Sequence, residues 1–545
     1  MSEAKISHGL GFLTGLHEAV ARTKGVTGLL FSALIGAFAA LAFAPFHISP
    51  ALAVAFVGLV WMLDGARGRK RWGRAMFARG WAFGYGYFLI SMYWTALPFL
   101  VEPERHAVFI WMPLIALPGG MALIWGAACA MAGAFWSSSP SRIFIFALFF
   151  ALAELVRGHL FGGFPWNLAG TTWIPGGALS QAASIGGVYW LTLITVIIMA
   201  APASLVDTRT QKGVLFRAIP SVIAVALLAF GFTWGSQRLT AETELTERSV
   251  VLMDAGVPQA EKFDNYRNTL ARYSQFLRET PSEAGDILIW PEGAVPTLLL
   301  QDTVALDQIA GFLGPRTLIA GTNRTDGIGE DRLNFNSLAV FQASANDADL
   351  VGLYDKHRLV PFGELAASEI VPFGNSLSGI LPGAIQRMAR SGFTPGPGTT
   401  VLYPENVPPF IPLICYEGLF PALPRQAEPR PENAEWMVII SNDAWFGAGL
   451  GPAQHYAQHR YRSIETGLPL ARVATRGLSG VVDAFGREIA RGAPVEGDPP
   501  RWRSSVVRAP LPAKTDRTPY ARFGATFFWI TITLSMILAF LTWRR

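Results

Sequence analysis

Long apolar runs without charges are confined to two parts of this 545-residue chain, and they constrain its fold more than any other feature. Residues 1–235 contain seven such runs and residues 518–545 contain one, while the sequence between them has the composition of a soluble protein. A helix that crosses a bilayer needs about 20 apolar residues. Only 15% of the chain is charged, whereas soluble proteins average about 25%. The sequence therefore predicts a membrane protein with eight transmembrane helices.

The expected spans are Val26–Ala44, Pro50–Leu63, Trp81–Val101, Val108–Trp136, Ile143–Val156, Ile185–Val206, Ala218–Trp234 and Phe523–Trp543. The second and the fifth are short for a bilayer, so their boundaries are the least well defined. No cleavable signal peptide is expected, because the first apolar run begins late and many others follow it.

Lysine and arginine gather on one side of these spans. The connection between the second and third spans contains Arg67, Arg69, Lys70, Arg71, Arg74 and Arg79. On the opposite side, segments 45–49 and 158–184 contain no lysine or arginine, and segment 98–107 contains only Arg105. Because basic loops stay in the cytoplasm, both termini are predicted to be cytoplasmic and the soluble part to lie outside. The formal net charge of +5 is then mainly a topology signal, and no basic stripe indicates a nucleic-acid partner.

The middle of the chain alternates short apolar runs with amphipathic stretches, which is typical of an α/β domain. Expected helices cover Gln259–Glu279 and Pro452–Thr466. Expected strands are Ser249–Met253, Ile287–Trp290, Thr317–Ala320, Ser337–Phe341, Leu350–Tyr354, Ile411–Cys415, Trp436–Ile440 and Val481–Asp483. The predicted class is thus an α+β membrane protein. Its expected domains are a membrane domain at 1–235, an outer domain at 236–517 and a last transmembrane helix at 518–545.

Three chemically competent side chains follow expected strands directly: Glu292, Lys356 and Cys415. Ligands gather at the carboxyl ends of strands in layered α/β folds. A cysteine nucleophile needs a base and a group that stabilises the oxyanion of the tetrahedral intermediate. Glu292 can take the thiol proton if burial raises its pKa toward the working pH, and Lys356 can stabilise the oxyanion. The sequence thus predicts covalent acyl chemistry.

The cysteine count supports a working thiol. The chain has two cysteines, and Cys129 lies inside an expected span, so no disulfide framework is possible. His455 and His459 lie four residues apart on an expected helix, which is a spacing that zinc sites use, but the glutamate of the metalloprotease pattern is missing. No metal and no cofactor are expected.

Several motifs resemble those of the nitrilase superfamily, and more specifically those of the apolipoprotein N-acyltransferase family. They are Trp290-Pro-Glu-Gly-Ala-Val-Pro296, Lys356 with Leu359-Val-Pro-Phe-Gly-Glu364, Cys415-Tyr-Glu417, Ser441-Asn-Asp-Ala-Trp-Phe-Gly447 and Arg462-Ser-Ile-Glu-Thr-Gly467. In the apolar half, Leu41-Ala-Phe-Ala-Pro-Phe46, Glu154-Leu-Val-Arg157 and Gly163-Phe-Pro-Trp166 are also similar to family motifs. The resemblance covers nearly the whole chain, from residue 26 to residue 545.

The resemblance implies an αββα sandwich on an eight-helix membrane domain in the bacterial inner membrane, with the sandwich in the periplasm. It implies Glu292 as base, Lys356 as oxyanion stabiliser and Cys415 as nucleophile. Glu364 would orient the lysine or assist proton transfer. Further residues that would shape the site or bind substrate are Tyr416, Glu417, Trp445 and Trp290. No cofactor is implied, and the family expectation is a monomer.

The reaction that the resemblance implies has two halves. First, the thiol attacks an acyl ester of a phospholipid and forms a thioester. The acyl chain then passes to the α-amine of a diacylglyceryl-modified cysteine at the N-terminus of an apolipoprotein. Membrane lipids are therefore expected partners, and nucleic acid is not. The apolar segment 366–398 is expected to be a lid near the bilayer, with a buried loop as the alternative.

The chain departs from the family pattern in three places. Asp254-Ala-Gly256 replaces a Gln-Gly-Asn-like run, and Thr475-Arg476-Gly477 replaces Asn-Thr-Gly. Arg476 is expected at the surface, with phospholipid phosphate as the alternative contact. Gly293 stands where a small polar residue is usual, and it is expected to loosen the turn that holds Glu292.

Two other functions remain open from the residues alone. A membrane-tethered amidase or nitrilase would use the same three groups with water as the acceptor, but it would need only one anchor helix. A transporter with an accessory outer domain would place polar residues or broken helices at the bilayer midplane. Glu154 and Arg157 lie three residues apart in the apolar half, and both an ion pair and headgroup binding are compatible with that spacing.

Overall fold

The computed structural model describes residues 3–206, 213–262, 266–281, 283, 285–344, 348–361, 363–364, 392–492 and 504–543. The chain divides into two compact units. One comprises residues 1–158, 165–240 and 523–545, and the other comprises residues 159–164 and 241–522. Residues 366–391 of the expected lid lie outside the described residues.

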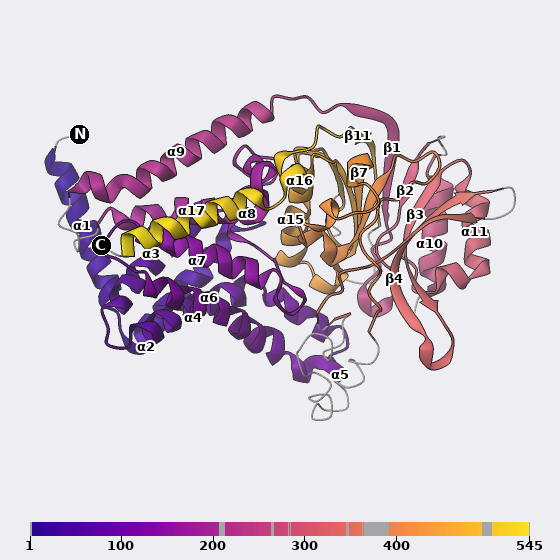
Figure 1. Ribbon diagram of the computed structural model, residues 1–545. Coiled ribbons are helices and arrows are strands. Elements are labelled where there is room, and N and C mark those ends of the chain that lie inside the picture. Colours follow the sequence, from indigo (N-terminus) through magenta and orange to yellow (C-terminus); the bar gives the residue numbers. More distant parts are fainter. Residues whose placement is uncertain are drawn as a thin grey trace. The chain divides into compact units, whose positions relative to one another are not determined.

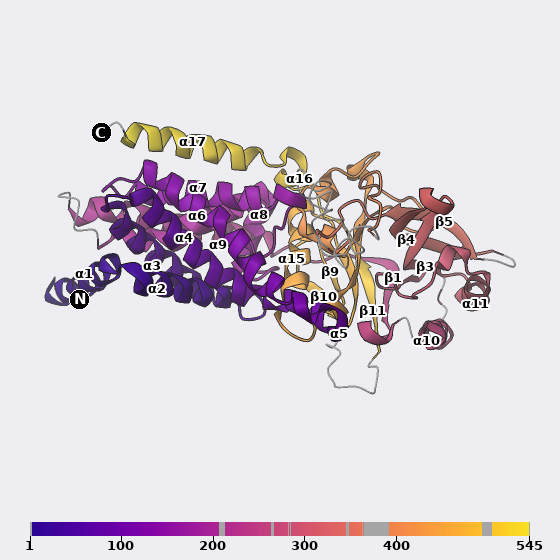
Figure 2. The same ribbon diagram turned by 90° about the horizontal axis from the view of Figure 1, so that it is seen from below.

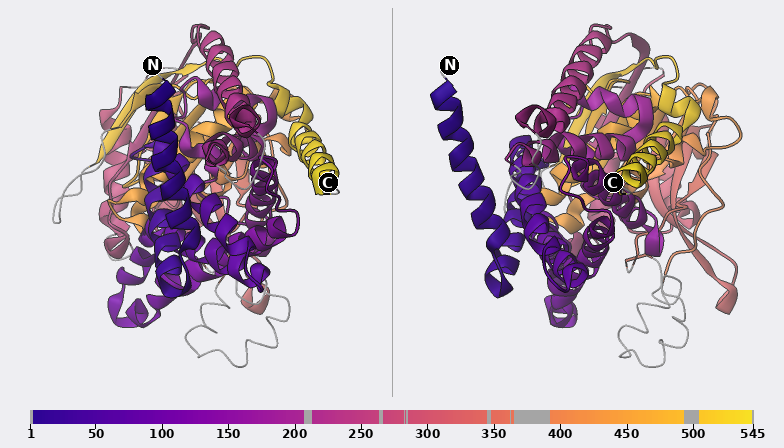
Figure 3. Two further views of the ribbon diagram at one scale, coloured as in Figure 1. Left: turned by 90° about the vertical axis from the view of Figure 1, so that its left-hand side faces the viewer. Right: turned by 60° about the vertical axis from the view of Figure 1, so that its left-hand side comes forward.

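The first unit is a helical bundle (Figures 1 to 3). Its principal helices are α1 (Glu3–Arg22), α2 (Gly25–Ala39), α3 (Ser49–Arg67), α4 (Trp72–Ser91), α6 (Leu117–Ala134), α7 (Arg142–Arg157), α8 (Ala183–Ala200), α9 (Val214–Arg238) and α17 (Thr526–Trp543). Short 3-10 segments join several of them, and a π-helical turn at Met112–Ala116 precedes α6. Within the described residues, five helices are long and apolar enough to cross a membrane. The count of eight spans stays a prediction.

The expected third span is misplaced in the sequence-based prediction. Helix α4 begins at Trp72, nine residues before the expected start, and the expected end forms a 3-10 helix at Tyr93–Leu100. Arg79 therefore lies inside a helix instead of a basic loop, and it is buried. Its guanidinium donates to the Thr23 carbonyl oxygen at 2.7 Å. Space for it exists because Gly28 has no side chain: a Cβ there would lie 1.9 Å from the guanidinium.

Glu154 and Arg157 form a structural ion pair on α7. The two groups are 2.6 Å apart and almost completely buried. Trp125 donates its indole N–H to Glu154 at 2.8 Å, and Arg157 donates to the Trp166 carbonyl oxygen at 2.9 Å. Because each charged group is paired and hydrogen-bonded, the pair is tolerated in an apolar bundle. Of the two alternatives left open by the spacing, the geometry supports the ion pair.

The second unit contains two stacked sheets. The six-stranded sheet has the order β11-β1-β2-β3-β4-β5, and the five-stranded sheet has the order β10-β9-β8-β7-β6. The strands are β1 (Leu245–Asp254), β2 (Ile287–Ile289), β3 (Thr317–Asp326), β4 (Leu333–Ala343), β5 (Ala348–Asp355), β6 (Phe410–Ile414), β7 (Trp436–Asn442), β8 (Leu470–Thr475), β9 (Gly480–Val482), β10 (Glu488–Arg491) and β11 (Ser505–Pro512). Strands β1 to β3 pair in parallel, as do β6 to β8.

Helices cover the outer face of each sheet, which makes the expected α/β sandwich. Helices α10 (Tyr266–Glu279) and α11 (Thr303–Leu313) pack on the six-stranded sheet through one hydrophobic core. Helix α15 (Leu450–Thr466) belongs to the other half. A second core lies between the sheets, where residues such as Leu338 and Trp436 are fully buried. Figure 1 shows these layers.

All eight expected strands are present, because their apolar runs face cores on both sides of each sheet. The prediction missed β8, β10 and β11. Strand β8 contains buried Arg472, whose charge interrupts the apolar pattern, and β11 contains Arg508 and two prolines. These strands form through hydrogen bonds to neighbouring strands, which local sequence does not reveal. Strand β11, for example, pairs antiparallel with β1.

The core between the sheets gives a stability prediction. Leu338→Ala on β4 removes a fully buried side chain, so the free energy of unfolding should fall by about 2–5 kcal/mol. Leu333→Ala on the same strand is the matched control, since Leu333 is 45% exposed and should cost under about 1 kcal/mol. Thermal unfolding of the purified protein in detergent measures both. Equal losses in the two variants would contradict the assigned core.

Candidate active site

The three chemically competent residues lie just beyond strand ends, as predicted. Glu292 follows β2 and Lys356 follows β5, both in the six-stranded sheet, while Cys415 follows β6 in the five-stranded sheet. All three are at least 90% buried. The Glu292 turn can approach the sheet closely because residue 321 on β3 is glycine, where a Cβ would lie 2.6 Å from the Glu292 Cα. The site is therefore assembled from both sheets.

Lys356 lies between two carboxylates. Its Nζ donates to Glu364 Oε1 at 2.8 Å and to Glu292 Oε1 at 3.2 Å. Asn336 on β4 reaches the same two groups, donating to Glu292 at 2.7 Å and to Glu364 at 2.9 Å. The backbone N–H of Asn442 donates to Glu292 Oε2 at 2.9 Å. Every oxygen of Glu292 is therefore hydrogen-bonded, which fixes the direction of this carboxylate.

Cys415 begins the turn after β6 in a strained backbone conformation. Its φ is +54°, in the left-handed region that non-glycine residues rarely occupy. Such a residue costs about 1–3 kcal/mol and persists only where its surroundings hold it. This conformation ends strand β6 at Ile414, so Cys415 takes no part in the pairing of the strands.

Glu417 provides the support for this turn. Its carboxylate is completely buried and accepts four hydrogen bonds. The donors are the backbone N–H of Ile414 at 2.8 Å, of His357 at 2.8 Å and of Arg358 at 3.0 Å, together with the Tyr354 hydroxyl at 2.8 Å. Glu417 thus ties the cysteine turn to the loop that carries Lys356. Its hydrogen bonds therefore join the ends of β5 and β6, which belong to different sheets.

The charges of the site support one another. Burial alone would raise the pKa of Glu292, but Lys356, Asn336 and Lys262 together lower it below its usual value. Burial would lower the pKa of Lys356, but Glu292 and Glu364 raise it well above its usual value. The resting forms are therefore carboxylate and ammonium. The condition that burial raises the pKa of Glu292 toward the working pH is therefore not met in the resting site, because Lys356, Asn336 and Lys262 outweigh burial.

The thiol of Cys415 rests in its protonated form. Burial raises its pKa, the charge of Glu292 raises it further, and Lys356 lowers it only in part. A protonated thiol is a weak nucleophile. The arrangement therefore calls for proton removal at the moment of attack, by a carboxylate that is already ionised.

A buried polar network lies behind the thiol. Ser441 lowers the pKa of the Cys415 thiol in part, and its hydroxyl donates to Asp443 Oδ1 at 2.7 Å. Asp443 also binds His455 Nδ1 at 3.0 Å and Arg472 at 2.8 Å. The two histidines noted for their spacing thus face a carboxylate and a guanidinium, since Arg472 donates to His459 Nδ1 at 2.9 Å. The network holds Ser441 against the reacting sulfur.

The other predicted site residues take different positions. Tyr416 donates its hydroxyl to the Gly163 carbonyl oxygen, and its ring packs near Phe164, within the short segment 159–164 that belongs to the second unit. Trp290 is fully buried and packs against Tyr273 with ring centroids 4.6 Å apart, so it supports the strand end from inside the core. Trp445 is 37% exposed.

The structure gives a reason for all three departures from the family pattern. Gly293 has φ +51°, a conformation that glycine adopts without strain, so this residue relieves the turn instead of loosening it. Asp254 accepts from the backbone N–H of Gly256 at 2.8 Å and of Arg476 at 3.0 Å. The Arg476 side chain is half-buried and donates to the Gly256 carbonyl oxygen at 3.1 Å. The two altered segments therefore bind each other.

Asn336 and Ser441 are site residues that sequence reasoning missed. Asn336 sits inside β4 and belongs to no recognisable local motif, so only the strand order brings it to Glu292. Ser441 was visible as the first residue of Ser441–Gly447. Its position at the end of an expected buried strand was a usable signal.

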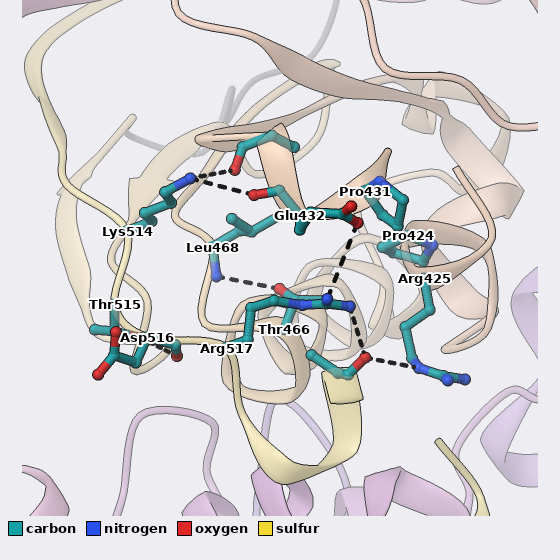
Figure 4. Close-up of a pocket in the computed structure, with 12 residues that line it drawn as sticks. Pro424, Arg425, Pro431, Glu432, Thr466, Leu468, Lys514, Thr515, Asp516 and Arg517 are labelled. Atoms are coloured by element: carbon teal, nitrogen blue, oxygen red, sulfur yellow. Dashed lines mark hydrogen bonds and ion pairs between the residues drawn. The ribbon is translucent and has the colours of Figure 1, made fainter. Parts of the chain in front are cut away.

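A pocket of about 160 Å³ lies elsewhere in the second unit and contains none of the predicted site residues (Figure 4). Its basic side chains hold neighbouring segments together. Lys514 donates to the Glu432 and Ala434 carbonyl oxygens, and both Arg425 and Arg517 donate to the Ala521 carbonyl oxygen. The pocket lies where neighbouring segments are hydrogen-bonded to one another, and Glu292, Lys356 and Cys415 do not line it.

The electrostatics of Cys415 predict opposite effects of two substitutions. In Lys356→Met the pH midpoint of thiol alkylation should move up, because the cation that lowers the pKa of the thiol is gone. In Glu292→Gln the midpoint should move down, because a carboxylate that raises the pKa of the thiol is gone. Below its midpoint the alkylation rate at a fixed pH falls as the pKa of the thiol rises, so the rates with iodoacetamide at pH 9, with Cys415→Ala as blank, measure both shifts. Midpoints that move in the same direction would contradict the arrangement.

The buried histidines predict a pH-dependent stability. Burial, His455 and Arg472 lower the pKa of His459 well below 6.5, so below pH 6.5 the unfolded chain binds a proton that the folded chain does not. Stability from this group is therefore lost as pH falls, by about 1.4 kcal/mol per pH unit. Asp254, whose pKa burial raises to about 6, titrates in the same range with the opposite sign.

Comparison with His459→Gln isolates the imidazole. Between pH 6.5 and 5 the variant should lose about 1.4 kcal/mol less per pH unit than the unsubstituted protein in thermal unfolding. Parallel pH profiles would mean that His459 is charged in the fold.

Both the apolar part and the α/β part of the chain are similar to known proteins. Residues 35–201 match the family model of the apolipoprotein N-acyltransferase N-terminal domain, and residues 256–496 match that of carbon-nitrogen hydrolase. Among solved structures, Saccharomyces cerevisiae Nit3, a member of branch 10 of the nitrilase superfamily, is 15% identical with a TM-score of 0.34, covering 50% of this chain and 93% of its own.

Much higher identity is found with two curated relatives. The apolipoprotein N-acyltransferase of Caulobacter vibrioides is 36% identical over 532 residues, which is 95% of each chain. That of Rhodopseudomonas palustris is 34% identical over 550 residues, which is 98% of each chain. This chain belongs to the apolipoprotein N-acyltransferase family.

Proposed function

We propose that the protein transfers a fatty acyl chain from a phospholipid, through a thioester on Cys415, to the N-terminal amine of a diacylglyceryl-cysteine apolipoprotein. The observation that carries the proposal is the buried set of carboxylate, ammonium and protonated thiol at three strand ends. Family membership supports the acyltransferase class, because the relatives carry the name apolipoprotein N-acyltransferase.

In the first half, Glu292 removes the thiol proton as the sulfur attacks the ester carbonyl carbon of the phospholipid. Lys356 stabilises the oxyanion that forms. The intermediate collapses, the carbon–oxygen ester bond breaks, and the proton on Glu292 passes to the departing lysophospholipid oxygen. Glu364 holds Lys356 in place through the 2.8 Å hydrogen bond and keeps its charge on the site.

In the second half, the amine of the apolipoprotein attacks the thioester carbon, and Glu292 accepts a proton from it. The carbon–sulfur bond breaks, the amide forms, and the proton returns to the Cys415 sulfur. Ser441 supports this departure, since its hydroxyl can turn from Asp443 to the thiolate. No net proton is gained or lost by the enzyme over the cycle.

The membrane arrangement follows from the same proposal. The proposed domains are a membrane domain at 1–235, a periplasmic catalytic domain at 236–517 and a last helix at 518–545, with eight spans in the inner membrane and both termini in the cytoplasm. Five apolar helices of sufficient length and the asymmetry of lysine and arginine support this topology. Both substrates carry lipid tails, so a site beside a bilayer avoids extracting them into water.

Hydrolysis is less favoured than transfer. A membrane-tethered amidase would use water in place of the amine, and the three groups alone suit either acceptor. The match of residues 35–201 to a domain model specific to N-acyltransferases favours the amine.

Mass spectrometry of the purified protein tests the proposal. With phospholipid alone, an acyl adduct should form on Cys415, and a diacylated lipopeptide with a free amine should discharge it. Cys415→Ala should give no adduct. Glu292→Gln and Lys356→Ala should slow adduct formation by about 10²–10⁴-fold, because each removes a group that acts in the transition state.

Two exposed substitutions serve as matched controls. Glu405→Gln and Lys514→Met change the same residue types away from the site and should form the adduct at the normal rate. Release of free fatty acid at a rate independent of the lipopeptide would identify a hydrolase. A normal rate in either Glu292→Gln or Lys356→Ala would overturn the assigned roles.

A further inference from the structure

Lys262 is a buried lysine beside the proposed base, and the mechanism above does not use it. It directly follows the 3-10 turn Gln259–Glu261, and only 6% of its surface is exposed. Its Nζ lies over the Glu292 turn, 3.4 Å from the position that a Cβ on Gly293 would occupy. Its charge acts on Glu292 and lowers the pKa of that carboxyl.

The ammonium has no directed partner of its own. Within the described part of the chain, no hydrogen bond or ion pair joins its Nζ to another group. Three N–H donors on a buried cation are costly to leave unmet. The other buried lysine of this site is paired, because Lys356 donates to two carboxylates.

The two nearby carboxylates are already occupied by closer donors. Glu292 accepts from Lys356, Asn336 and the Asn442 N–H. Asp254 accepts from the Gly256 and Arg476 N–H groups. Glu292 and Asp254 therefore stabilise the positive charge of Lys262 electrostatically, but neither accepts a hydrogen bond from its ammonium. Burial lowers the pKa of Lys262 to about 8, so the group is still mainly cationic at neutral pH.

We propose that the Lys262 ammonium binds the phosphodiester of the acyl donor and so selects phospholipid over acyl esters that lack phosphate. This inference rests on the proposed function. Of the two substrates, only the phospholipid carries a phosphate, and a short glycerol link separates that phosphate from the ester under attack. A lysine at the base of the Glu292 turn holds the headgroup while Cys415 reaches the carbonyl carbon.

The charged groups packed around Lys262 allow an anion to bind. Glu292 and Asp254 act on Lys262 and are each satisfied as described, while Arg476 acts on the same Asp254 and donates to the Gly256 carbonyl oxygen. Arg476 adds a second cation on the Asp254 side. A phosphate oxygen would supply the acceptor that the ammonium lacks, and charge-assisted hydrogen bonds of this kind are among the strongest in proteins.

The test compares two acyl donors on the full-length protein in detergent. One is phosphatidylethanolamine, and the other is p-nitrophenyl palmitate, an acyl ester without phosphate. The rate of Cys415 acylation is followed by mass spectrometry for the unsubstituted protein, Lys262→Met, Lys262→Arg and the exposed control Lys514→Met. Lys262→Met keeps the length of the side chain and removes only the charge and donors.

In Lys262→Met, acylation by phosphatidylethanolamine should slow by roughly 10- to 100-fold, the loss expected for one charged hydrogen bond. Acylation by p-nitrophenyl palmitate should change by less than about threefold, and Lys262→Arg should recover much of the phospholipid rate. Lys514→Met should match the unsubstituted protein with both donors.

Equal slowing with both donors would overturn the proposal and make Lys262 a positioning residue for Glu292. An unchanged phospholipid rate would overturn it as well. If the unsubstituted protein forms no adduct with either donor, the proposed acyl transfer itself fails. These results are therefore distinguishable from a failure of phosphate binding alone.

Discussion

The site depends on one buried carboxylate, that of Glu417. The nucleophile and the ammonium come from different sheets, so no strand pairing holds them in register with each other. Glu417 supplies that link, because it accepts from the Ile414 N–H at the end of β6 and from the His357 and Arg358 N–H groups after β5. Without these bonds, the left-handed Cys415 turn would lose the contacts that offset its strain.

Charge balance then decides the resting state. The contacts of Lys356 with Glu292 and Glu364 keep both Glu292 and the ammonium ionised, although Glu292 and Lys356 are buried. Burial and the charge of Glu292 keep the Cys415 thiol protonated until a substrate binds. A thiol that is inert at rest and activated at the moment of attack suits an enzyme that works outside the reducing cytoplasm, as the proposed topology requires.

Sequence reasoning was most reliable where chemistry and strand pattern coincided. Glu292, Lys356 and Cys415 were predicted at strand ends because each follows an apolar run of strand length. It failed where distant contacts decide. Arg79 was assigned to a loop because a charge argues against a span, yet the carbonyl of Thr23 and the missing side chain of Gly28 accommodate it inside α4. Asn336 and Lys262 carry no local signal, since their importance comes from neighbours about 30 to 45 residues away.

By itself, the sequence determined the apolar helices, the buried strands and the family, and it identified Glu292, Lys356 and Cys415 as the candidate reacting groups. These properties follow from the periodicity of apolar residues and from short motifs, and both can be recognised without knowing which distant residues are in contact. Only the tertiary structure decided that Glu292 rests ionised, that Glu417 joins the two sheets, and that no hydrogen bond from the described residues reaches the ammonium of Lys262. Each of these depends on distances between residues far apart in the chain, because electrostatic energy and hydrogen bonding vary steeply with separation and burial.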